Sequence, residues 1–157
     1  MTPVCHYCGR GCTWSPSSSH IYDGRDFGPV WECVPCEARV GCHRTGPNPG
    51  RAALGTPAKK EDALLRRRAH ELFDPLWQRV AARDGISRSH ARSRAYRWLA
   101  AELGKDPVDT HIGMMFGDDL RRVIECCTPP FGLGARRGCH KDVAVPRTEL
   151  PKPVLEG

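Results

Sequence analysis

The sequence has no long run of apolar residues, and its first residues do not have the features of a secretory leader. No stretch approaches the roughly 18 consecutive apolar residues that a membrane-spanning helix needs, so we expect no contact with a membrane. The opening residues, MTPVCHYCGRGC, lack the basic region, the apolar region and the small-residue cleavage site of a signal peptide. We therefore expect a cytoplasmic protein, in which cysteine thiols stay reduced.

Apolar residues are also scarce overall, and they make up only 39% of the 157 residues. Glycine, with 16 residues, and proline, with 14, favour turns and loops. These proportions exclude a large hydrophobic core, and the length suits one domain joined to a small module.

Cysteine is abundant, and its odd count of nine argues against a closed disulfide framework. Two Cys-x2-Cys pairs, Cys5 with Cys8 and Cys33 with Cys36, are separated by 24 residues. This spacing is typical of a four-cysteine zinc ribbon, in which two tight turns place four thiolates about 2.3 Å from one Zn²⁺ ion. Four thiolates leave no position for water, so we expect one structural zinc ion and no catalytic residues.

Neighbouring residues keep other ligand sets open. Cys42 or His43 could replace one cysteine of the second pair. A second metal is a further alternative, with the candidate ligands Cys12, Cys42, His43 and His20. The cysteines without a partner at ligand spacing are Cys126, Cys127 and Cys139.

The pattern of residue types predicts a small α+β fold. Residues 1–45 are expected to form the ribbon of short antiparallel strands, with strands in HIYDG and in PVWEC. The remaining parts are a Gly/Pro linker at 46–58, a region of about three helices at 59–127, and a mostly disordered tail at 128–157.

Three helices are expected in the second half. Apolar residues recur at helical period over 59–83, where Pro75 predicts a kink or a break, with Asp74 as the cap of a new helix. Ser87 and Gly104 have the residue types that begin and end a second helix. A third helix is expected in GDDLRRVIECC.

The net charge of +6 lies in the middle of the chain, because residues 59–105 carry twelve basic and six acidic residues. A local basic excess attracts polyanions. The candidate contacts on the second helix, which we expect to be exposed, are Arg88, His90, Arg94 and Arg97; the ribbon adds Arg25, Arg39 and Arg44. The ribbon's aromatic residues could stack on bases, although Trp31 and Tyr22 are expected to fill its small core.

Several longer motifs resemble a known family. CHYCG, IYDGRDFGPVWEC, CEARVGCHRT, RRAHELFDPLW, AYRWLAAELG and HIGMMF occur in this order in the chain. Together they resemble a family of small zinc-finger-containing proteins found in bacteriophages and prophages. The resemblance covers about residues 4–127 and implies a phage origin, a bacterial host cytoplasm and zinc on the two Cys-x2-Cys pairs, but no settled activity. The ribbon is also similar to the C-terminal zinc ribbons of bacterial type I topoisomerases, which bind single-stranded DNA.

These patterns favour an accessory protein that binds nucleic acid, single strands included, through the basic helical face. The alternative is an interaction module for a host or defence protein. A metal-dependent nuclease comes third, because the spacing of His43, Asn48 and His70 does not match a nuclease pattern well enough to support it. We expect no enzymatic activity, and we expect zinc removal to unfold residues 1–45 while the helices survive.

Overall fold

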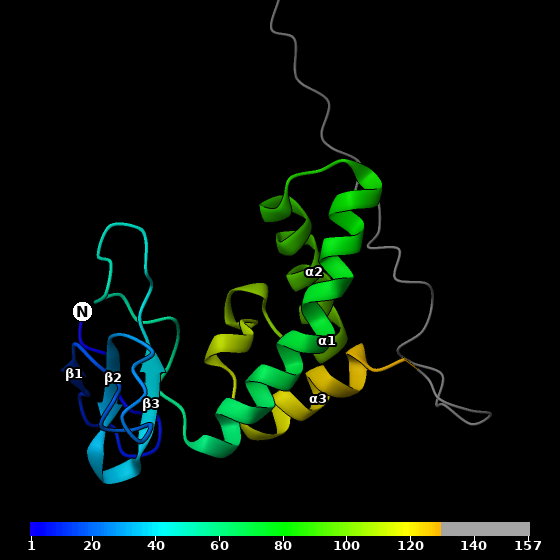
Figure 1. Ribbon diagram of the computed structural model, residues 1–157. Helices are drawn as coiled ribbons and strands as arrows, with labels where there is room; N and C mark the ends of the chain where they lie inside the picture. The colour runs from blue at the N-terminus through cyan, green and yellow to red at the C-terminus, as the bar shows by residue number, and fades with distance from the viewer. Residues whose placement is uncertain (130–157) are drawn as a thin grey trace, which may run out of the picture.

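The structure is a computed structural model that describes residues 1–129, so the tail expected at 128–157 falls almost wholly outside the described residues. A three-stranded antiparallel sheet at one end is followed by three helices at the other, which confirms the small α+β fold (Figure 1). The strands, in the spatial order β1-β2-β3, are β1 (Thr13–Ser15), β2 (Val30–Cys33) and β3 (Ala38–Gly41). The helices are α1 (Lys60–Asp84), α2 (Arg88–Leu103) and α3 (Gly117–Cys127), and the 3-10 turns are η1 (Val34–Cys36), η2 (Pro107–Asp109) and η3 (Ile112–Met114).

The sheet is built around β2, the strand expected in PVWEC. Trp31 of β2 is buried, and it lies opposite Trp14 of β1 and Val40 of β3. The strand expected in HIYDG is wrong, because residues 19–24 form turns. Asp23 and Gly24 both have positive φ, at 51° and 84°, which an extended strand does not allow.

Backbone hydrogen bonds tie the segment at 46–58 both to the ribbon and to the helical half. Arg39 of β3 and Ala58 exchange two such bonds, of 2.8 and 2.9 Å. The N–H of Thr56 donates to the carbonyl of Gly113 in η3 at 3.1 Å. A Cβ atom on Gly55 would lie 2.3 Å from that same carbonyl oxygen, so only glycine fits this approach.

The sequence predicted a kink or a break at Pro75, and the break is wrong, because helix α1 runs without interruption through this residue. Proline removes one backbone hydrogen bond and crowds the preceding turn. The helix survives because side chains on either side of the proline, Phe73 and Trp77, are buried in one common core. Asp74 does not cap a new helix; its carboxylate accepts a hydrogen bond from the Trp77 indole N–H at 3.0 Å.

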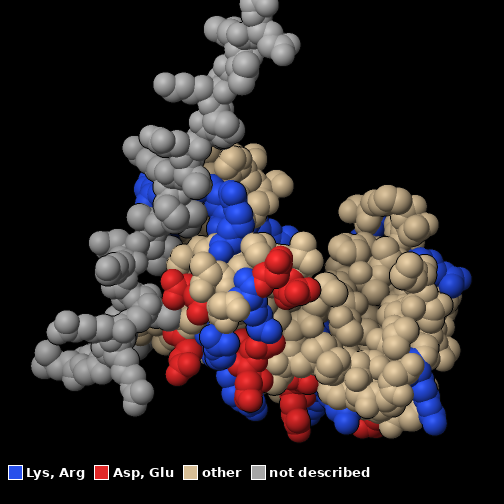
Figure 2. All heavy atoms as spheres, turned by 180° about the vertical axis from the view of Figure 1, so that it is seen from behind, with Lys and Arg blue, Asp and Glu red and all other residues tan. Residues whose placement is uncertain are grey.

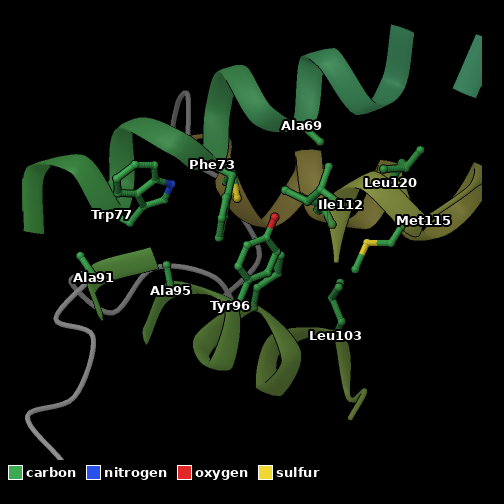
Figure 3. Packing of buried hydrophobic residues seen from close by; sticks show 13 residues of the cluster. Ala69, Phe73, Trp77, Ala91, Ala95, Tyr96, Leu103, Ile112, Met115 and Leu120 are labelled. Atoms are coloured by element: carbon green, nitrogen blue, oxygen red, sulfur yellow. The ribbon is translucent and has the colours of Figure 1, made fainter. Parts of the chain in front are cut away.

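Helices α2 and α3 begin and end where the sequence predicts. The Ser87 hydroxyl accepts a hydrogen bond from the N–H of His90, and Gly104 ends α2 with φ of 63°. All three helices contribute to one core (Figure 3), whose fully buried members include Phe73, Leu99, Ile112, Leu120 and Val123. Among residues 1–129, no helix is both long enough and apolar enough to cross a membrane.

The core predicts a large effect for one truncation. Phe73→Ala should lower the free energy of unfolding by about 3–5 kcal/mol, because the ring is fully buried between α1 and α2. Denaturant unfolding of the zinc-loaded protein measures this change. The matched control is Phe27→Ala, whose ring is 62% exposed and should cost no more than about 1 kcal/mol. Equal losses in the two variants would contradict the assigned core.

Candidate metal centre

The two Cys-x2-Cys pairs meet at one end of the sheet. The sulfur atoms of Cys5, Cys8, Cys33 and Cys36 all lie within 4.8 Å of one another. Cys8 Sγ and Cys33 Sγ are 3.5 Å apart. Tetrahedral zinc with Zn–S bonds of about 2.3 Å requires sulfur atoms about 3.8 Å apart, so the four thiols fit one zinc ion.

Each pair sits on a tight turn that local backbone bonds define. In the first turn, the N–H of Gly9 donates to the carbonyl of Cys5 at 2.8 Å, and Gly9 has φ of 71°. In the second turn, Glu37 has φ of 55° and its N–H donates to the carbonyl of Val34. Glu37 therefore takes the left-handed conformation that Gly9 takes in the first turn, although glycine adopts it more readily.

The thiols strongly affect one another's ionisation. Backbone N–H hydrogen bonding at Arg10, followed by the thiol of Cys36, lowers the pKa of Cys8 to about 7. The hydrogen bond with Cys8 and then burial raise the pKa of Cys36 to about 12. One thiolate thus forms easily, but several thiolates this close repel one another. A bound dication removes that repulsion, which is the chemistry that a Zn²⁺ ion supplies.

The other candidate ligands lie outside this cluster. Within residues 1–129, the four cysteines form the one group of three or more such side chains close enough to share a metal ion. Cys42 is buried beside Trp31 in the ribbon core, and burial raises the pKa of its thiol. His43 is exposed, and His20 lies 3.2 Å from Glu32.

The candidate cations of α2 have different surroundings. Arg88, His90 and Arg97 are exposed. The Arg94 side chain is only 11% exposed and lies 3.6 Å from Asp84, so its expected exposure is wrong. Because the connection between α1 and α2 is short, Arg94 lies close to the last residue of α1. A helical wheel of α2 alone does not show this contact.

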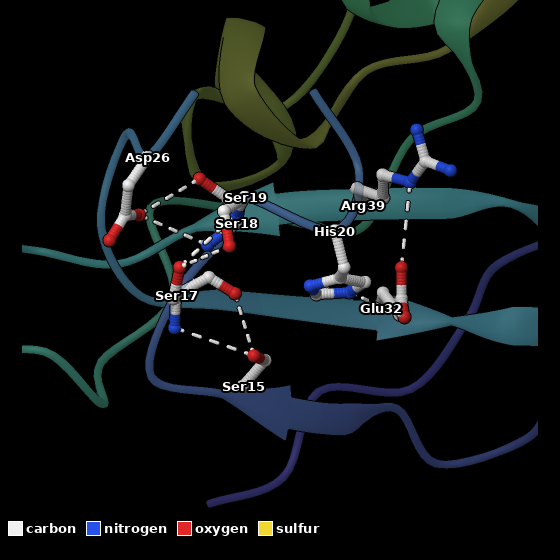
Figure 4. A network of polar contacts seen from close by, with 8 residues as sticks. All are labelled: Ser15, Ser17, Ser18, Ser19, His20, Asp26, Glu32 and Arg39. Carbon is white, nitrogen blue, oxygen red and sulfur yellow. Dashed lines mark hydrogen bonds and ion pairs between the residues drawn. The ribbon is translucent and has the colours of Figure 1, made fainter. Parts of the chain in front are cut away.

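The candidate cations of the ribbon differ in the same way. Arg25 and Arg44 are exposed, whereas Arg39 is half-buried and lies 3.6 Å from Glu32 (Figure 4). Sequence reasoning missed Arg92, which is exposed one turn after Arg88 on the same side of α2. The i, i+4 spacing of these two arginines is the signal that could have identified it.

The first metal turn also joins the ribbon to the helices. His6 and Tyr7, the two residues between the first pair of cysteines, both contact the helical half. The His6 ring stacks on Phe116, with centroids 4.0 Å apart and planes 11° apart. The Tyr7 hydroxyl donates to the Asp62 carboxylate, which also accepts a hydrogen bond from the N–H of Gly117 at 2.8 Å.

Arg66 reinforces this junction from α1. Its side chain is buried, its Nε donates to the carbonyl of Met115 at 3.0 Å, and its Nη1 donates to the carbonyl of Thr56. The guanidinium lies 4.6 Å from the ring centroid of Phe116. Ribbon and helices therefore share a polar and aromatic contact that depends on the fold of the first metal turn.

The geometry predicts one zinc ion per chain. Single substitutions to serine at any cysteine of the four should abolish stoichiometric zinc, because a tetrahedral site with three thiolates and a weak hydroxyl loses most of its affinity. Elemental analysis of the purified variants measures this. Cys42→Ser is the matched control and should retain one zinc ion. Zinc lost from the control but kept by Cys36→Ser would show that the ligand set is different.

The junction predicts that zinc removal destabilises the helices as well. We expect far-ultraviolet circular dichroism to lose much of the helix signal in one transition as a strong chelator removes the ion, because His6 and Tyr7 leave Phe116 and Asp62. This replaces the expectation that the helices survive. Phe116→Ala should weaken the coupling and retain more helix after chelation. Full helix content in the chelated wild type would contradict the coupling.

The comparison with known proteins agrees with this site. A search among curated proteins and a search among solved structures found no match. A profile of zinc-finger-containing domains matches residues 1–130, which is most of the chain. The match spans the four-cysteine cluster and all three helices, so the ribbon and the bundle both lie within the matched domain. The four clustered thiols make this chain a structural zinc-binding module, and it belongs to the family of zinc-finger-containing domains.

Proposed function

We propose that this zinc-stabilised protein binds nucleic acid, and that its α2 arginines contact the phosphate backbone. The observation that carries the proposal is a groove of about 460 Å³ between α1 and α2. Its lining residues are Trp77, Arg88, Ser89, Arg92, Ser93, Tyr96 and His111. Cations, hydroxyls and aromatic rings line the groove without a carboxylate, which is a composition suited to a phosphate chain.

The rings of the groove position its cations. The Arg88 guanidinium lies 5.4 Å from the Trp77 ring centroid, and that of Arg92 lies 5.6 Å from Tyr96. Tyr96 in turn stacks on His111 with centroids 4.9 Å apart. A guanidinium over an aromatic face keeps its N–H groups available for phosphate and loses less conformational entropy on binding.

The groove also differs from the rest of the helical surface in its charge. Basic and acidic side chains are interspersed over the helices on the face seen in Figure 2. Arg67 and Arg68 of α1 both lie near Glu71, and Arg83 forms an ion pair with Asp84. Among the described residues, Arg88 and Arg92 have ring contacts in place of an acidic partner. Their charge is therefore available to a polyanion.

Two further features support the proposed binding of nucleic acid. The sequence resemblance to phage and prophage proteins suits an accessory factor that acts on nucleic acid in the host cytoplasm. Zinc enters only as a structural element, because the four thiolates would fill its coordination shell.

The proposal predicts a charge-specific loss of binding. The double variant Arg88→Ala/Arg92→Ala should weaken binding to a 20-mer duplex and to its single strand by at least about tenfold, because two charge-assisted contacts are lost. The slope of log affinity against log salt should fall by about one to two units. Fluorescence anisotropy at graded salt measures both quantities.

The control removes the same charge elsewhere. Arg121→Ala/Arg122→Ala changes two exposed arginines of α3 and should leave the salt slope and the affinity near those of the wild type. Wild-type protein that binds neither oligonucleotide at low salt would overturn the proposal and favour a protein partner.

A further inference from the structure

We propose that a second groove, between the ribbon and α1, receives unpaired bases of the same nucleic acid, so that the preferred ligand is single-stranded. This inference rests on the proposed function and adds the kind of strand to it. The groove has a volume of about 660 Å³. Its walls are the loop 18–28, the β2–β3 edge and the first turns of α1.

The loop presents two exposed aromatic rings to this groove. Tyr22 is 43% exposed and Phe27 is 62% exposed, and their ring centroids lie 5.0 Å apart at an interplanar angle of 86°. Neither ring belongs to the ribbon core, in contrast to the expectation for Tyr22. Exposed aromatic rings in a groove offer flat apolar faces, and each nucleobase has a matching face.

A network of hydrogen bonds fixes the loop that holds these rings (Figure 4). The Asp26 carboxylate accepts hydrogen bonds from the backbone N–H groups of Ser18 and Gly28, at 3.1 and 2.8 Å. The Ser18 hydroxyl accepts one from the N–H of Phe27 at 2.8 Å. These backbone hydrogen bonds keep the pKa of Asp26 below its usual range, so the carboxylate remains ionised and the rings are held in place before any ligand binds.

The opposite wall supplies apolar surface and positive charge. Leu64 of α1 is 57% exposed and lies in the groove beside Ala63. The groove's charged residues are three cations, Arg39, Lys60 and Arg67, and one acid, Glu37. Arg39 and Arg67 also lie near Glu32 and Glu71, so the available positive charge comes mainly from Lys60. This charge favours a phosphate nearby, and the exposed rings favour an occupant with stacking faces.

A single strand combines these two properties. In a duplex the base faces are stacked on one another, so a protein reaches base edges and phosphates only. Unpaired bases can leave the stack and lie on side-chain rings while their phosphates meet nearby cations. The aromatic pair with flanking cations thus selects an unpaired strand over a duplex.

The test compares a thymidine 12-mer, as a single strand, with a random-sequence 20-mer duplex, using zinc-loaded full-length protein. Tyr22→Ala/Phe27→Ala should weaken binding to the single strand by about tenfold or more, because stacking is lost. The duplex affinity and the salt slopes should not change, because no charge is removed. Zinc content and circular dichroism confirm that the variant is folded.

Two further variants separate the possible outcomes. Tyr22→Leu/Phe27→Leu retains apolar bulk without ring faces, and it should weaken single-strand binding as the alanine pair does. Val108→Ala/Met114→Ala removes two exposed apolar side chains outside the groove and should bind as the wild type does.

The inference fails by itself if the ring variants bind the single strand normally while Arg88→Ala/Arg92→Ala weakens it. It also fails if the leucine pair binds normally, because the groove would then need apolar bulk only, as a peptide site does. A wild type that binds neither oligonucleotide would overturn the proposed function along with it.

Discussion

Four thiols held within 4.8 Å of one another are the constraint on which this fold depends. The ribbon contains little apolar material apart from Trp31 and its neighbours, so hydrophobic burial alone gives it little stability. Close thiolates without a cation would repel one another and open both turns. Coordination of one ion would replace this repulsion by attraction and hold the two turns together. The strands β2 and β3 flank the second turn, so they would be held in place as well.

We expect the effect of this ion to extend beyond the ribbon, because the residues between Cys5 and Cys8 belong both to the metal turn and to the contact with the helices. They shape the metal turn, and they also contact α1 and the start of α3 through Asp62 and Phe116. Burial and then the hydrogen bond to Asp62 raise the pKa of Tyr7 to about 12, so its hydroxyl remains a donor throughout the physiological range. The Tyr7–Asp62 hydrogen bond is therefore insensitive to pH near neutrality.

The sequence predicts the features that local chemistry decides. The cysteine spacing identified the cluster, and Ser87 and Gly104 marked the ends of α2, because caps and metal turns depend on a few adjacent residues. Features that depend on distant contacts were missed. The burial of Phe73 and Trp77 keeps α1 continuous at Pro75. The ion pair with Asp84 leaves the Arg94 side chain largely buried. Of the residues that line the arginine groove, only Arg88 was predicted as a contact. Arg92 was missed on the same helix, and His111 and Trp77 reach the groove from other elements.

The contact between Gly55 and Gly113 has a geometric consequence. Since the two backbones approach too closely for even a methyl group, the ribbon cannot slide along the bundle without breaking the Thr56–Gly113 hydrogen bond. The ribbon–α1 groove and the α1–α2 groove are therefore fixed at one separation by the covalent chain and by this contact. A ligand that occupied both grooves would therefore have to span one constant distance.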